Sequence, residues 1–78
     1  MAYILVIDDN AVIRDVVRFT LQNRHSVTLA NDGEEAIRLA ESSHYDLIIT
    51  VVSMPGMSGL EVVKELARLK HTVQQAVY

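Results

Sequence analysis

Residues 46–61 read DLIITVVSMPGMSGLE, and they combine an apolar run, a sharp break and a helical pattern. The run over 47–52 is apolar and β-branched, the break is the Met-Pro-Gly of 54–56, and a helix resumes after Gly59. A near-continuous apolar strand is typical of a parallel sheet that helices cover on both faces. A loop between such a strand and a helix lies at the carboxyl edge of the sheet, where open α/β folds bind ligands.

Two similar strand–helix units precede this segment. Residues 3–7 form a short apolar run that ends abruptly at Asp8 and Asp9, and residues 26–30 alternate as an edge strand does. Helical patterns cover 11–22 and 34–43, and a third covers 60–69. Successive strand–helix units with short loops predict an α/β fold with a parallel sheet and right-handed crossovers. We expect a three-layer, flavodoxin-like sheet with strand order 2-1-3.

The first helix is predicted to begin at a polar cap, either Asp9 or Asn10. One side of its pattern is apolar and is expected to face the sheet. The residues on that side are Val12, Ile13, Val16, Val17, Thr20 and Leu21.

The last nine residues, 70–78, read KHTVQQAVY and fit two interpretations. Val73, Ala76 and Val77 would suit another helical turn, whereas Val73, Gln75 and Val77 would share one face of a strand. The pattern does not separate the two, and we favour a short fourth strand.

Composition narrows the functional class. The chain has 78 residues, which suits one small domain, residues 1–78, and it contains no cysteine, so neither disulfides nor a thiolate metal site can stabilise it. Its net charge is −3 and its basic residues are scattered, which argues against nucleic-acid binding. No apolar run approaches the roughly 18 residues of a membrane span. We therefore expect a soluble, cytoplasmic protein that uses neither nucleic acid nor membrane.

Two separated motifs resemble the receiver domains of two-component response regulators. Met54 and Pro55, followed by the helix-opening Gly59, are similar to the loop after the third strand of that family, and Asp8 and Asp9 match its acidic pair after the first strand. The resemblance covers almost the whole chain, from residue 3 to about residue 69. It implies the flavodoxin-like fold expected above.

The resemblance also implies a phosphorylation site that this chain lacks at its centre. In the family, an acidic pair holds Mg²⁺ beside an aspartate that accepts the phosphoryl group. Here Asp8 and Asp9 would be the pair, and Ser53 would add its backbone carbonyl, but the acceptor position is occupied by Val51. Valine has no oxygen, so it can neither accept phosphate nor bind the metal. No cofactor is therefore required, and at most weak Mg²⁺ binding is expected.

Simpler interpretations of the same residues stay open. Asp8 and Asp9 can simply end a strand and cap a helix, and Thr50 and Ser53 can be a core residue and a loop hydroxyl. Val51 would relieve the repulsion that a third carboxylate adds beside Asp8 and Asp9. We expect it to stabilise the fold without metal.

The family continues through two more strand–helix units, with a hydroxyl residue and a lysine at their strand ends, and no segment here matches them. Lys70 lies at the wrong end of a helix to be that lysine. A truncated sheet would leave the strand over 46–52 with an unpaired edge, and such apolar edges recruit other chains. We expect a homodimer or a larger assembly, with residues 72–78 taking part by pairing or exchange, and C2 is the symmetry that we favour. The edge residues would be Ile48, Ile49, Val51 and Val52.

The resemblance, without the acceptor, predicts a degenerate and non-phosphorylatable receiver-like module. It would not be an enzyme and would act by protein–protein contact, with a histidine kinase or another receiver domain as partner. One alternative is a phosphotransfer protein that uses another acceptor or a site completed by a second subunit. Another is an engineered or fragmentary receiver with no function of its own.

Overall fold

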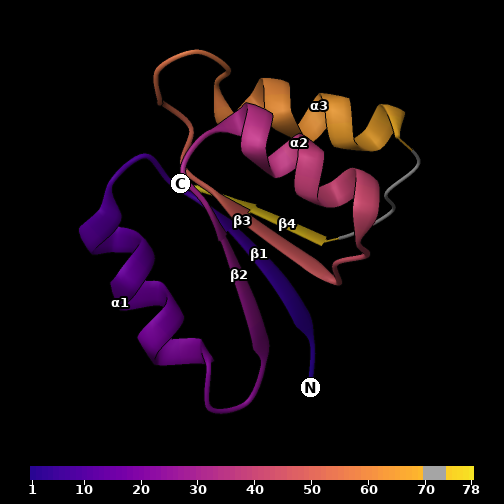
Figure 1. Ribbon diagram of the computed structural model, residues 1–78. Helices are drawn as coiled ribbons and strands as arrows, with labels where there is room; N and C mark the ends of the chain where they lie inside the picture. The colour runs from indigo at the N-terminus through magenta and orange to yellow at the C-terminus, as the bar shows by residue number, and fades with distance from the viewer. Residues whose placement is uncertain (70–73) are drawn as a thin grey trace.

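The computed structural model describes residues 1–69 and 74–78, and over these residues the chain forms a four-stranded parallel sheet between helices (Figure 1). Strands and helices alternate along the chain. They are β1 (Tyr3–Ile7), α1 (Ala11–Leu21), β2 (Ser26–Ala30), α2 (Gly33–Ser42), β3 (Leu47–Thr50), α3 (Gly59–Arg68) and β4 (Gln74–Val77).

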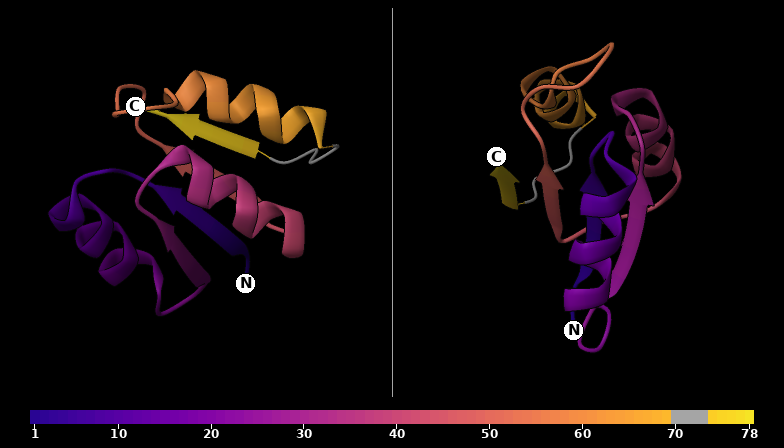
Figure 2. Two further views of the ribbon diagram at one scale, coloured as in Figure 1. Left: turned by 45° about the horizontal axis from the view of Figure 1, so that its top comes forward. Right: turned by 90° about the vertical axis from the view of Figure 1, so that its left-hand side faces the viewer.

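The strands lie in the order β2-β1-β3-β4, and every neighbouring pair is parallel. The first connection runs from β1 to β2, and the next two run in the opposite direction across the sheet. Because crossovers are right-handed, this reversal places α1 on one face and both α2 and α3 on the other (Figure 2). The predicted three-layer flavodoxin-like fold and the order 2-1-3 are confirmed, with β4 as the short fourth strand.

The reversal also creates a switch point between β1 and β3, where side chains at the carboxyl ends of the two strands come together. Val6 of β1 is in register with Ile49 of β3, and Ile7 is in register with Thr50. The residues that follow, Asp8 and Val51, therefore lie next to each other at this edge.

The main core lies between the sheet and the pair α2 and α3. Leu5 and Ile7 of β1 belong to it, together with Ile48 of β3. The two helices contribute Ala36, Ala40, Val62 and Leu66, all of them buried. Since side chains alternate along a strand, the equally buried Ile4 and Val6 face the layer that contains α1.

Helix α1 covers its face of the sheet only partly. None of its residues is buried, and only Val17 and Leu21 of the predicted inward side are half-buried hydrophobics. Val12 and Val16 are exposed by 68% and 57%, so the prediction that they face inward is wrong. In the described part of the chain no second helix lies beside α1, and its outer apolar side therefore stays in contact with solvent (Figure 1).

Strand β3 is an interior strand, which corrects the expectation of an unpaired edge over 46–52. β4 pairs with it in parallel, with Ile48 in register with Gln75 and Ile49 with Ala76. The ladder extends past the strand ends, because Tyr78 N donates to Thr50 O at 3.0 Å and Val52 N donates to Tyr78 O at 2.6 Å. The edge assigned to Ile48, Ile49, Val51 and Val52 is thus covered by this same chain.

Local signals explain the helix boundaries. Asn10 caps α1, Asp32 caps α2 through a bond from Glu35 N, and Ser58 caps α3. In α3, Glu61 N donates to Ser58 Oγ and Ser58 N donates to Glu61 Oε1, which forms a reciprocal capping box. Residues 70–73, which include Lys70 and the start of the predicted tail strand, lie outside the described residues. Over the described ranges, no helix is both long and apolar enough to cross a membrane.

Candidate functional site

The acidic corner is formed where β1, β3 and β4 end, by Asp8, Asp9, Val51 and Tyr78. Asp8 follows β1 directly, Val51 follows β3, and Tyr78 follows β4. This is the switch point of the sheet, where an open α/β fold places its ligand. The structure therefore brings together Asp8 and Val51, as the sequence predicted, and adds a tyrosine that the sequence reasoning missed.

Asp8 is the buried member of the corner, with 3% of its surface exposed. Its Oδ1 accepts a hydrogen bond from Asn10 N at 2.9 Å, and its Oδ2 accepts one from the Tyr78 hydroxyl. Its backbone is held as well, since Asp8 N donates to Ala30 O at 3.2 Å and Arg14 Nη1 donates to Asp8 O at 2.6 Å. A buried carboxylate needs such partners, because leaving it unpaired is costly.

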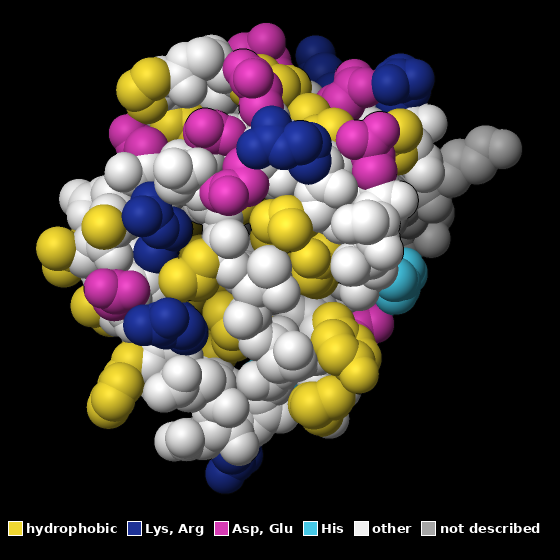
Figure 3. All heavy atoms as spheres, viewed as in Figure 1, with side chains coloured by type: hydrophobic (Ala, Val, Ile, Leu, Met, Phe, Trp, Pro, Cys, Tyr) yellow, Lys and Arg dark blue, Asp and Glu magenta, His cyan; other side chains and the backbone are white. Residues whose placement is uncertain are grey.

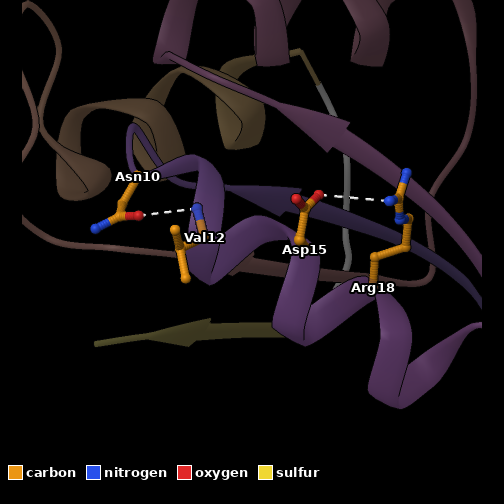
Figure 4. A network of polar contacts seen from close by, with 4 residues as sticks. All are labelled: Asn10, Val12, Asp15 and Arg18. Carbon is orange, nitrogen blue, oxygen red and sulfur yellow. Dashed lines mark hydrogen bonds and ion pairs between the residues drawn. The ribbon is translucent and has the colours of Figure 1, made fainter.

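Asp9 and Asn10 form the turn from β1 into α1, and both are exposed. Asn10, one of the two predicted caps, accepts a bond on Oδ1 from Val12 N at 2.9 Å (Figure 4). One turn further, Arg18 Nη2 and Asp15 Oδ1 form a surface ion pair at 3.4 Å (Figure 4). The simpler interpretation of the acidic pair is thus partly right: Asp8 ends the strand and Asn10 caps the helix.

Val51 lies at the centre of the corner and is apolar and half-buried. Its side chain packs against the main core, and its N donates to Ile7 O at 3.1 Å. The buried Thr50 donates from Oγ1 to Val51 O at 3.0 Å, so its hydroxyl is occupied by the backbone. This agrees with Thr50 as a core residue.

The loop after Val51 closes tightly onto α3. Gly59 N donates to Val52 O at 2.7 Å, and Gly56 has a φ of +79°, which glycine adopts without steric cost. Within this loop, Met54 is buried in the core, whereas Ser53 is exposed. The predicted metal role of the Ser53 carbonyl stays a prediction.

Tyr78 contributes a hydroxyl from the end of β4. Its donation to Asp8 joins residues 70 positions apart in the chain. Desolvation and the hydrogen bond to Asp8 raise the pKa of Tyr78 to about 12, and the nearby charges of Asp8 and Asp9 act in the same direction. The neutral phenol is therefore the form that the corner favours. No segment was matched to the hydroxyl residue that the family carries at its fourth strand end, and the structure places a tyrosine hydroxyl, that of Tyr78, directly after β4.

The residues of the acidic corner do not fit a Mg²⁺ centre. Magnesium prefers oxygen ligands in octahedral arrangement. Val51 supplies none, and both oxygens of Asp8 already accept hydrogen bonds from protein groups. Within residues 1–69 and 74–78, no three acidic or histidine side chains are grouped as metal ligands.

A second surface feature is the exposed apolar strip of α1, which consists of Val12, Val16 and Phe19. These residues, with Asp15 and Thr20, line an open groove along the helix. Phe19 is 75% exposed. In Figure 3 hydrophobic side chains protrude at the left, over α1, whereas acidic and basic side chains dominate the top, over α2 and α3.

Comparison with known proteins identifies close relatives of the fold and of the sequence. A family model for the response regulator receiver domain matches residues 4–78. The response regulator MprA of Mycolicibacterium vanbaalenii is 44% identical over 64 residues, which is 81% of this chain and 28% of the relative. The chain thus spans a little over a quarter of that relative's length.

Solved structures give the same result at the level of the backbone. The chemotaxis protein CheY4 of Vibrio cholerae superimposes with a TM-score of 0.95 at 36% identity, over 99% of this chain and 67% of that chain. The response regulator TrrA of Thermotoga maritima was solved in complex with Mg²⁺ and BeF, with a TM-score of 0.89 at 39% identity over 96% of this chain and 66% of that chain. TrrA was also solved in complex with the histidine kinase ThkA, where the TM-score is 0.90 at 38% identity over 99% of this chain and 67% of that chain.

Proposed function

Because this chain belongs to the response regulator receiver domain family, we propose that it is a receiver-like signalling module that is not phosphorylated and acts by protein–protein contact. One observation carries the proposal: Val51, without a reactive oxygen, stands at the end of β3 beside Asp8. The backbone at this position is held in the sheet, since Val51 N and Val51 O both have hydrogen-bond partners. The scaffold is therefore retained while the acceptor is absent.

Several properties follow from this assignment. The module, residues 1–78, is not an enzyme and requires no cofactor, and any Mg²⁺ binding is weak because Val51 provides no ligand. We place it in the cytoplasm, in keeping with a two-component signalling role. The chain covers 28% of the length of MprA, and we propose for it none of the activities of that longer relative.

The partner that we propose is a histidine kinase, and the surface that would contact it is the exposed apolar strip of α1, Val12, Val16 and Phe19. TrrA, which has the same fold, was solved with a histidine kinase, and this supports the choice of partner. Val16 and Phe19 are exposed apolar residues on one helix, and burying apolar area drives association. A module that binds the kinase but takes no phosphate would compete with phosphorylatable receivers.

Phosphorylation is tested by incubating the protein with Mg²⁺ and a small phosphodonor, followed by intact-mass measurement. We expect no gain of mass. A gain of one phosphoryl group would contradict the proposal and favour an alternative acceptor or a site shared between subunits.

Binding is tested with purified histidine kinases from the source organism, by titration against the immobilised module. Val16→Asp should weaken binding at least about tenfold, because a charge replaces a contact residue. Leu60→Asp is the matched control, since Leu60 is also an exposed helical hydrophobic, at 55% against 57%, but lies on α3. Equal affinity of the two variants for a bound kinase would exclude α1 as the contact surface, and the absence of binding to any kinase would contradict the proposed partner.

We also propose self-association, now through the outer edge of β4. Gln74–Val77 is exposed along its whole length, and in the described part of the chain nothing pairs with its outer side. An exposed strand edge is a template for another chain. A two-fold axis across this edge would pair the two β4 strands antiparallel and give the C2 dimer expected from the sequence.

A further inference from the structure

We infer that the Tyr78 hydroxyl takes the place of a bound cation at Asp8, so that the acidic corner is closed and stable without metal. This inference goes beyond the signalling role proposed above, and its test uses no partner protein.

Asp8 is 3% exposed and carries a carboxylate at the switch point of the sheet. A buried carboxylate must be balanced either by a cation or by hydrogen-bond donors. The donors here are Asn10 N on one oxygen and the Tyr78 hydroxyl on the other. The Tyr78 hydroxyl is the side-chain donor of this pair, and a substitution can therefore remove it.

Backbone hydrogen bonds to β3 and to the residues that follow it hold Tyr78 in place. Both backbone groups of Tyr78 are hydrogen-bonded: Tyr78 N donates to Thr50 O at 3.0 Å, and Tyr78 O accepts from Val52 N at 2.6 Å. The strand ladder therefore delivers the phenol to Asp8, and little further ordering is needed. A metal ion would have to displace this hydroxyl from the oxygen that it occupies.

A carboxylate at position 51 would stand beside Asp8 and would require a cation to offset the repulsion. Val51 adds no second carboxylate beside Asp8, and the neutral hydroxyl of Tyr78 is then a sufficient hydrogen-bond donor for the Asp8 carboxylate. Val51 and Tyr78 are thus two complementary parts of one metal-independent arrangement.

The first measurement is the stability of Tyr78→Phe without metal, by urea unfolding. We expect a clear loss of stability relative to the wild type, because Asp8 loses a donor on a buried oxygen. Tyr3→Phe is the matched control: Tyr3 is exposed by the same 50% as Tyr78 but lies at the opposite end of β1, and this variant should unfold like the wild type. Equal stability of Tyr78→Phe and Tyr3→Phe would overturn the inference.

The second measurement is Mg²⁺ affinity by calorimetry, in a background where position 51 can bind metal. We compare Val51→Asp with Val51→Asp/Tyr78→Phe, using MgCl₂ alone as the ligand. Removing the hydroxyl should tighten Mg²⁺ binding about tenfold or more, as expected when a competing hydrogen bond to a charged group is lost. The same affinity in both variants would show that Tyr78 does not occupy the place of the cation.

Discussion

The Cα of Gly59 faces the backbone carbonyl of Val51 so closely that a Cβ built on Gly59 would overlap that oxygen, and it would lie 3.1 Å from Oγ1 of Thr50. Gly59 N also donates to Val52 O at 2.7 Å. The start of α3 is thus locked against the end of β3.

Gly59→Ala should therefore destabilise the protein. Alanine is the better helix former by about 1 kcal/mol, but its methyl group requires backbone movement at Val51. We expect a net loss of about 1–3 kcal/mol, comparable to overpacking in a core, measured by urea unfolding. Gly56→Ala is the contrast, because its Cβ meets open space and only the positive φ is strained. An unchanged or increased stability of Gly59→Ala would contradict a steric conflict between a side chain at position 59 and the Val51 carbonyl.

Val51→Asp should lower stability in the absence of divalent metal. The new carboxylate would lie half-buried beside Asp8, and we expect a loss of about 1–3 kcal/mol. Val51→Thr removes apolar surface without adding charge and should cost less. Thermal unfolding followed by circular dichroism, with the metal chelated, separates the two. If Val51→Asp were as stable as the wild type under these conditions, Val51 would not be what makes the corner independent of metal.

Removing either side chain of the α3 capping box should lower the free energy of unfolding, and the two losses should be coupled. Ser58→Ala removes the acceptor for Glu61 N and should cost about 1 kcal/mol. Glu61→Ala removes the acceptor for Ser58 N, and the double variant should lose less than the sum of the single losses. Ser53→Ala, at an exposed loop serine outside any helix, serves as the control and should be close to neutral. Strict additivity of the two single losses would argue against a coupled box.

Self-association through β4 is tested by size-exclusion chromatography with light scattering at low micromolar concentration, where we expect a dimer. Backbone groups of Tyr78 face β3, so by strand alternation Gln75 directs its N–H to the outer edge. Gln75→Pro should therefore dissociate the dimer without breaking the β3–β4 ladder, whereas Gln75→Ala should leave it intact. A wild-type monomer, or a dimeric and folded Gln75→Pro variant, would contradict the proposed interface.

Much of the fold could be read from local patterns. Strands at 3–7 and 26–30 have their predicted bounds, and the three helices differ from prediction by one residue at each shifted end. These elements carry strong signals: β-branched runs, helical spacing and polar caps such as Asn10 and Asp32. The predicted third strand, 46–52, was one residue too long at its start and two residues too long at its end. At the end, Val51 and Val52 continue the backbone pairing after regular strand geometry stops.

Contacts between distant segments could not be read in the same way. The apolar side of α1 has a regular helical pattern, but burial depends on which elements lie beside the helix, and Val12 and Val16 are exposed. The pairing of β4 with β3 converts a supposed open edge into an interior strand. The polar and apolar residues of 74–77 carry too weak a pattern to predict that pairing.

From the residues alone came the class of fold, the strand order around β1, the acidic pair after β1 and the missing oxygen at Val51. The class of fold and the acidic pair depend on residue type and spacing along the chain, the strand order depends on the succession of strand–helix units, and the role of position 51 depends on the resemblance to receiver domains. The partner of the buried Asp8 carboxylate came from the fold, since Tyr78 is 70 positions away and reaches Asp8 only because β4 lies beside β3. A hydrogen bond depends on where atoms meet in space, and that position is a property of the assembled sheet.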